Sequence, residues 1–260
     1  MKIRLPAVSG SFYPSDTIVL QDMLTGFFDQ AQRKPVEGLK ALIVPHAGYV
    51  YSGAVAAAAY QSLFGSSFKN IVLLGPAHRV WIPDIALSTA EAFRTPLGDV
   101  PLHTDWAQKL SEKFDYVTFN DEPHQEEHAL EVQLPFLQRC LSGFKVLPLV
   151  VGGASAEQVA DVLDVFYPEA LIIISSDLSH YLTYLQCQKI DSKTIQDILH
   201  FKTTLQGEQA CGCHPLNGFL AFAHKHALQL TCVKSCNSGD TAGDKHSVVG
   251  YAAFVAVTSV

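Results

Sequence analysis

The sequence predicts an α/β fold: a three-layer sandwich with a mostly parallel central sheet, helices on both faces and an antiparallel edge at the C-terminus. Two features indicate this fold, namely short runs of Val, Ile and Leu that do not alternate with polar residues, and amphipathic segments between these runs. Strands buried on both faces have such continuous apolar runs, and helices cover both faces of such sheets. We expect one domain over residues 1–260, because no linker, repeat or low-complexity segment divides the chain.

Each element follows from its local pattern. The first helix is expected from the helical spacing of apolar residues between Leu20 and Phe28, behind a cap at Ser15. Apolar runs predict buried strands at residues 39–45, 70–76, 145–151 and 170–175. Amphipathic spacing predicts the remaining helices at residues 52–64, 129–141, 156–166 and 216–228. Residues 229–237 and 248–257 alternate more clearly between apolar and polar side chains and are predicted to pair as the antiparallel edge.

Composition excludes several classes of protein. The chain is 48% hydrophobic and 17% charged, which is typical of a globular protein. Its net charge of −7 and the lack of a cluster of Lys and Arg argue against a nucleic-acid partner. We expect no membrane partner either, because no apolar run approaches the length of a membrane helix, and the first residues lack the apolar core of a signal peptide. The six cysteines follow no disulfide framework, so a cytoplasmic protein is expected.

Polar side chains follow three of the predicted strands. His46 comes after the run at 39–45, His78 after the run at 70–76, and Asp177 and His180 after the run at 170–175. Ligands of open α/β sheets bind beyond the carboxyl ends of the strands, so these side chains are expected at one rim. A single His after a strand is more often a cap or a core hydrogen-bond donor than a ligand. Agreement among three strands instead favours a shared polar site, although spacing does not decide which members bind a metal.

Two further segments carry candidate groups. In ACGCHPLNGF, Cys211, Cys213 and His214 lie just before a predicted helix, where a thiol is expected to have a lowered pKa and to be able to bind a metal as a thiolate. No second pair of cysteines accompanies them, so a zinc ribbon is not indicated. In EEHALEVQLPFLQRC, His128 and Glu131 are predicted on one helix face, either beside the pocket or in a surface ion pair.

Six segments, in this order along the chain, resemble the Memo family, whose bacterial and archaeal members are often called AmmeMemoRadiSam system protein B. They are PHAGYVYSG, GPAHR, EEHALEVQLPFL, SSDLSHY, ACGCHPLNGF and SVVGYAAFV. The resemblance extends from GSFYPS near the start to the last predicted strand. It implies a fold similar to the class III extradiol (LigB-like) dioxygenases, non-haem enzymes that hold iron(II) with two His and one carboxylate.

The resemblance also implies roles for individual residues. Metal ligands are implied at His46, His78 and Cys211, with the cysteine where the dioxygenases have a carboxylate. A catalytic acid/base is implied at His180, with Asp177 close to it. Aromatic residues at the pocket mouth are implied at Phe12 and Tyr51, and His128 is expected beside them from its own segment.

These residues are consistent with three functions. The first is a redox enzyme that uses one divalent metal ion. Fe(II) is the ion expected first and Zn or Cu are the alternatives, because a thiolate ligand shifts the preference of the site toward softer metals. The second is a protein that binds a small molecule or peptide in the same pocket without turnover. The third is a metal-assisted hydrolase, in which Asp177 and His180 activate a water molecule. Family association further implies partnership with an AMMECR-like protein and a radical S-adenosylmethionine enzyme.

Overall fold

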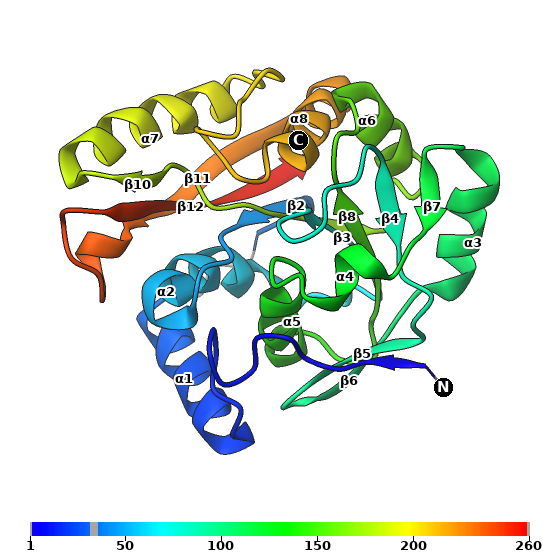
Figure 1. Ribbon diagram of the computed structural model, residues 1–260, viewed down its shortest axis with the longest axis horizontal. Helices are drawn as coiled ribbons and strands as arrows, with labels where there is room; N and C mark the ends of the chain where they lie inside the picture. Colours follow the sequence, from blue (N-terminus) through cyan, green and yellow to red (C-terminus); the bar gives the residue numbers. More distant parts are fainter. Residues whose placement is uncertain (1, 32–35, 259–260) are drawn as a thin grey trace.

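The computed structural model describes residues 2–31 and 36–258 and contains one large and one small sheet (Figure 1). The strands of the large sheet are β2 (Leu39–Val44), β3 (Asn70–Pro76), β4 (Ile85–Leu87), β7 (Val117–Phe119), β8 (Lys145–Val151), β9 (Leu171–Ser175), β10 (His180–Leu182), β11 (Leu228–Asn237) and β12 (Val248–Thr258). They lie in the order β10-β12-β2-β9-β3-β8-β4-β7, with β11 paired to β12. The small sheet contains β1 (Ile3–Arg4), β5 (Ala92–Thr95) and β6 (Gly98–Pro101).

The centre of the large sheet is parallel, as predicted. β9 lies between β2 and β3 and pairs in parallel with both, and β3 pairs in parallel with β8. β12 runs antiparallel to β2 on one side and to β11 on the other, which confirms the antiparallel C-terminal pair. The three parallel strands β2, β9 and β3 therefore end side by side, and the polar residues that follow them are brought to one edge.

Helices cover both faces of the large sheet, which confirms the three layers (Figure 1). The helices are α1 (Thr17–Gln30), α2 (Tyr49–Tyr60), α3 (Thr104–Lys113), α4 (Glu122–Gln125), α5 (Leu134–Cys140), α6 (Ala156–Asp164), α7 (Tyr184–Leu199) and α8 (Cys213–Lys225). On β2, Leu42 and Val44 pack in one core with α1, α2 and α5, whereas Ala41 and Ile43 pack in a second core with α3, α6 and α8. None of the helices in residues 2–31 and 36–258 is long and apolar enough to cross a membrane.

Several element boundaries differ from the predictions. Asp16, not Ser15, caps α1, because its side chain accepts hydrogen bonds from the N–H groups of Ile18 and Val19. The predicted helix at 129–141 is only partly α-helical: a 3₁₀ turn at Glu131–Gln133 precedes α5, which starts next to Pro135. Several elements were not predicted from the sequence, among them α3, α7 and the short strands β4 to β7. Helices α3 and α7 and strands β6 and β7 keep one side toward solvent, so their apolar residues are fewer, whereas β4 is buried but only three residues long.

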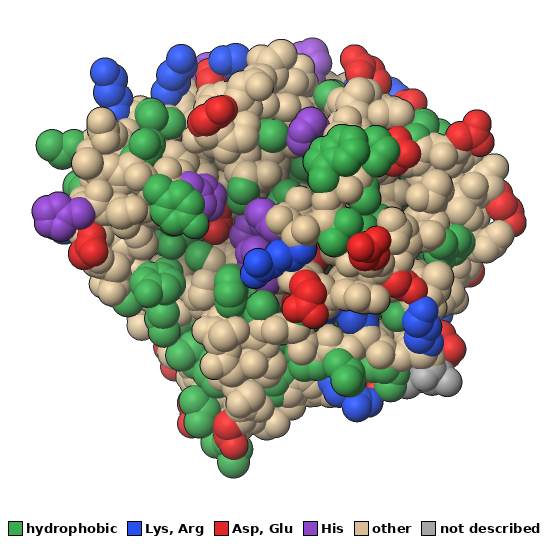
Figure 2. Space-filling view, viewed as in Figure 1, with side chains coloured by type: hydrophobic (Ala, Val, Ile, Leu, Met, Phe, Trp, Pro, Cys, Tyr) green, Lys and Arg blue, Asp and Glu red, His purple; other side chains and the backbone are tan. Residues whose placement is uncertain are grey.

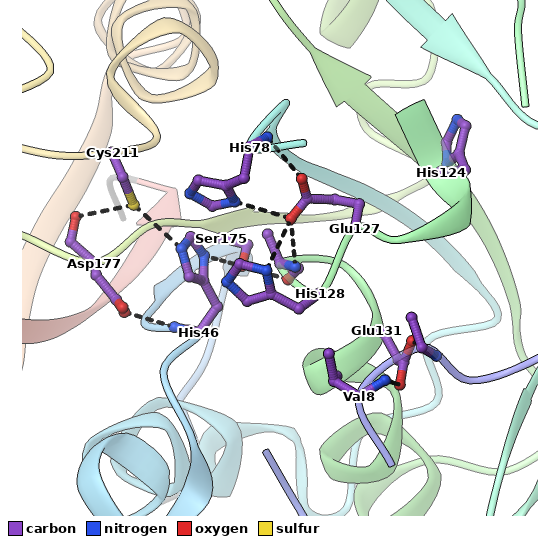
Figure 3. Close-up of polar contacts among 12 residues, drawn as sticks. Val8, His46, His78, His124, Glu127, His128, Glu131, Ser175, Asp177 and Cys211 are labelled. Atoms are coloured by element: carbon purple, nitrogen blue, oxygen red, sulfur yellow. Dashed lines mark hydrogen bonds and ion pairs between the residues drawn. The ribbon is translucent and has the colours of Figure 1, made fainter. Parts of the chain in front are cut away.

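Glu131 does not share a helix face with His128, and it is buried, away from the cavity that His128 lines. Its buried carboxylate pairs with Arg4 at 2.6 Å. It also accepts hydrogen bonds from the N–H groups of Ala7 at 2.7 Å and Val8 at 3.1 Å, and from the Tyr13 hydroxyl at 2.6 Å. A buried carboxylate is tolerated only with such a set of donors. Glu131 therefore fixes the N-terminal segment against the core, away from the candidate site (Figure 3).

Candidate metal centre

A cavity of about 770 Å³ opens at the carboxyl ends of β2, β9 and β3. Its walls carry the predicted site residues His46, His78, Asp177, His180 and Cys211, together with Phe12 and His128. The space-filling view shows histidine side chains gathered in this hollow between apolar side chains (Figure 2). The structure therefore brings together residues that are distant in the chain, such as His46 and Cys211, which are 165 positions apart.

His46 is held in one tautomer by a chain of hydrogen bonds. The Ser175 hydroxyl donates to the Ala129 carbonyl at 2.7 Å and accepts from the Gln133 amide at 2.9 Å. A hydroxyl has one proton to donate, so its contact of 2.9 Å with His46 Nδ1 must be one in which the imidazole donates. The lone pair of His46 is thereby assigned to Nε2, which lies 3.1 Å from Cys211 Sγ. This nitrogen is available to a metal ion.

Glu127 sets the tautomer of His78 in the same way. The His78 main-chain N–H donates to Glu127 Oε2 at 2.7 Å, and His78 Nδ1 lies 2.9 Å from Glu127 Oε1 (Figure 3). Burial alone would raise the pKa of Glu127, but hydrogen bonds from His78 and from the Ala129 N–H lower it to about 2. The carboxylate is therefore an acceptor only, so His78 Nδ1 carries a proton, and in the neutral imidazole Nε2 is the nitrogen with the lone pair. Histidine ligands of metal ions are commonly oriented by a carboxylate in this way.

His128 completes a cluster of three imidazoles. Its ring stacks on His78, with centroids 4.7 Å apart, and lies edge-on to His46 at 5.3 Å. The ligand atoms that His46, His78 and His128 offer lie within 4.8 Å of one another, so this cluster could hold a metal ion. Burial lowers the pKa of His46 and that of His128, the latter to about 3, so both imidazoles are neutral near pH 7, as ligands must be.

Cys211 lies just before α8, but its thiol does not have the lowered pKa expected at a helix N-terminus. Burial raises the pKa of Cys211, and the neighbouring Asp177 carboxylate raises it further. The Sγ atom contacts His46 Nε2 and lies 3.7 Å from the Asp177 carbonyl. A divalent cation at this position would supply the positive charge that a buried thiolate requires. The assignment of His46, His78 and Cys211 as the ligand set stays a prediction, with His128 as a further candidate donor.

Asp177 and His180 both line the cavity, but they differ in burial and in hydrogen bonding. Asp177 is buried and accepts a hydrogen bond from the His46 main-chain N–H at 2.7 Å. Burial raises its pKa to about 6. His180 is half-buried on β10, and in the described part of the chain no hydrogen bond joins the two side chains. Their catalytic roles stay predictions.

The two predicted aromatic positions line connected hollows. Phe12 contributes to the main cavity, and its ring lies 4.7 Å from that of His128. Tyr51 lines an adjoining hollow of about 590 Å³, which shares Phe12, His128 and Asp177 with the main cavity. The space beside the histidine cluster therefore extends beyond the first cavity.

Sequence reasoning missed the residues that orient the imidazoles. Glu127 precedes His128 directly, and the pair of acidic residues in EEHALE was a usable signal. Ser175 and Gln133 carried no such signal, because a serine at the end of an apolar run and a glutamine in a helical segment are ordinary residues. Their roles emerge only when β2 and β9 pair.

Comparison with known proteins agrees with this architecture. A family model described as Memo-like protein matches residues 4–255. A MEMO1 family protein of Aquifex aeolicus is 37% identical, covering 96% of this chain and 98% of its own. A MEMO1 family protein of Methanosarcina mazei is 35% identical, covering 98% of this chain and 99% of its own. The chain therefore belongs to the Memo family.

Proposed function

We propose that this chain is a metal-dependent redox enzyme that holds one divalent ion, Fe(II), through His46, His78 and Cys211. The observation that carries the proposal is that the imidazoles of His46 and His78 are both held by hydrogen bonds at Nδ1. Ser175 and Glu127 occupy the Nδ1 side of His46 and His78, which leaves Nε2 of each ring as the nitrogen that could bind a metal ion. The Cys211 thiol, 3.1 Å from His46 Nε2, adds a third donor. When bound, iron with three protein ligands supplies redox chemistry at positions left open for substrate and dioxygen.

The residues of the chain account for binding and proton movement. Cys211 must lose its proton to become a ligand, so metal binding releases a proton and strengthens as the pH rises. His180 lies on the cavity wall, where an imidazole can take a proton from a bound substrate and return it. Asp177 fixes the main chain of His46 and holds that ligand in place.

Dioxygen uptake by iron-loaded protein tests this function. Wild type, His180→Gln and His200→Gln are compared with catechol and hydroquinone as probes, after iron content has been matched by elemental analysis. His200 lies at the end of α7 outside the cavity and serves as a matched control. We expect uptake by wild type and His200→Gln, and a loss of about 10²-fold or more in His180→Gln with iron retained. Equal uptake in all three proteins would remove His180 from the mechanism.

The shape of the cavity favours a second function, ligand binding without turnover. The main cavity and the hollow beside Tyr51 share Phe12 and His128, so together they can take a ligand longer than a single ring. Iron-loaded protein that binds the probes but consumes no dioxygen would favour this second function over the first.

A further inference from the structure

Within residues 2–31 and 36–258, Arg79 is the only Lys or Arg that lines the main cavity. It is exposed at the cavity wall and, among the described residues, forms no hydrogen bond or ion pair. Asp177 and Glu208 line the same cavity, yet neither is paired with Arg79. A guanidinium group presents a planar set of donors that matches a carboxylate in a bidentate arrangement. Arg79 therefore offers an unused anion-binding group to whatever enters the cavity.

The backbone that carries Arg79 is fixed rather than free. Glu127 binds both the main-chain N–H and the imidazole of His78, the residue just before Arg79. Arg79 lines the same cavity as His46, His78 and His128. The guanidinium is thus close to the histidine cluster. A basic side chain is visible at the edge of the hollow, next to the histidines (Figure 2).

Other parts of the cavity wall are apolar. Phe12, Tyr181, Leu182 and Ile190 line it. Tyr181 is 78% exposed and has a φ of 58°, a left-handed conformation that bulky residues rarely adopt. Strained residues of this kind occur often at ligand sites, where the surrounding structure holds them in place. The fold therefore keeps an aromatic ring exposed at the mouth of the cavity, where the flat body of a ligand can stack on it.

We propose that the ligand of this cavity is a small carboxylic acid, whose carboxylate is held by Arg79 and whose apolar body lies against Phe12 and Tyr181. A single arginine matches a carboxylate better than a phosphate dianion, which would need more positive charge. The inference rests on the proposed use of the cavity as a substrate site. Its test needs no metal, so its failure and that of the redox function can be told apart.

Binding of matched acids and amides to chelator-treated protein tests the inference. The probes are benzoate against benzamide and phenylacetate against phenylacetamide, with affinities measured by ligand-observed NMR titration. The proteins are wild type, Arg79→Gln, Arg79→Lys and Arg139→Gln, the last an exposed arginine on α5 outside the cavity. We expect wild type to bind an acid about tenfold more tightly than its amide. Arg79→Gln should lose this preference, Arg79→Lys should keep part of it, and Arg139→Gln should keep all of it.

Three results would overturn the inference. They are no binding of either acid, a preference for the acid that survives in Arg79→Gln, and binding of inorganic phosphate more tightly than either acid. A protein that binds these acids through Arg79 but consumes no dioxygen when loaded with iron would contradict the redox function and leave the carboxylate site standing.

Discussion

Glu127 holds His78 at two points, accepting the main-chain N–H at 2.7 Å and contacting Nδ1 at 2.9 Å. The same carboxylate lies 3.4 Å from His128 Nδ1. One side chain therefore organises two of the three imidazoles that could hold a metal ion. Glu127 is buried and acts only as a hydrogen-bond acceptor. A glutamine at this position would therefore not replace its negative charge.

Glu127→Gln should weaken metal binding without unfolding the protein. The amide removes the negative charge that makes His78 a stronger donor, and its NH₂ group cannot accept the hydrogen bonds. Losses of this kind typically reduce metal affinity by about 10- to 100-fold. Competition with a chromophoric chelator measures the effect, and the exposed neighbour Glu126→Gln is the control. Unchanged affinity in Glu127→Gln would mean that His78 does not bind the metal.

Glu131→Ala should destabilise the fold and leave the site intact. It removes the carboxylate that pairs with the buried Arg4 guanidinium and that accepts from the Ala7 and Val8 N–H groups. Removing one partner of a buried ion pair lowers the free energy of unfolding by about 3–5 kcal/mol. Urea unfolding measures the loss, with the exposed Glu169→Ala as control. A loss below about 1 kcal/mol, the range of surface ion pairs, would show that this network contributes little.

His124 should make the stability of the protein depend on pH. Burial lowers the pKa of this histidine from 6.5 to about 4, and Arg4, Asp121 and Glu127 are the charged groups near it. Its imidazole lies 3.0 Å from the Ala86 carbonyl. Between these two pKa values the unfolded chain binds the proton and the folded chain does not. The stability that His124 contributes is therefore complete above pH 6.5 and is lost as the pH falls toward 4.

A comparison of wild type with His124→Gln isolates this effect from the other histidines. Between pH 6.5 and pH 4 the free energy of unfolding of wild type should fall by about 3 kcal/mol more than that of the variant. Urea unfolding at several pH values in this range measures the difference. Parallel pH profiles for the two proteins would contradict a buried, neutral His124.

Gly212→Ala should disturb the site, because a Cβ atom has no room there. It would lie 2.7 Å from Ser176 Cβ and 2.8 Å from the Ser175 carbonyl oxygen, so the segment next to Cys211 must move. We expect a loss of about 1–3 kcal/mol in the free energy of unfolding, together with weaker metal binding. Gly26→Ala on α1 is the control, since nothing lies within 4 Å and the change should stabilise the helix by about 0.5–1 kcal/mol. Equal effects of the two substitutions would contradict the close packing at Gly212.

The sequence was sufficient to predict the central sheet and where its polar residues meet. The runs ending before His46, His78 and Asp177 are short and have no polar alternation, which is typical of strands buried on both faces. Once those strands were placed in parallel, their carboxyl ends had to share an edge. The ligand candidates followed from this topology and from the resemblance to the Memo family.

The residues that were not predicted depend on contacts between distant segments. Glu131 has the same local spacing to His128 as a helix-face pair, yet a 3₁₀ turn directs it toward Arg4 and the N-terminal segment. The pKa of Cys211 is set by burial and by Asp177, not by the helix that follows it. Neither effect can be read from spacing, because both depend on which side chains the folded chain encloses.

The central claim is that His46, His78 and Cys211 hold one metal ion, and elemental analysis of anaerobically purified protein tests it most directly. Wild type should contain about one metal ion per chain, and His46→Ala and Cys211→Ser should both lose it. His128→Ala tests the alternative donor and should retain the metal. Two results would contradict this ligand set. One is wild type without metal, and the other is metal retained in His46→Ala and Cys211→Ser but lost in His128→Ala.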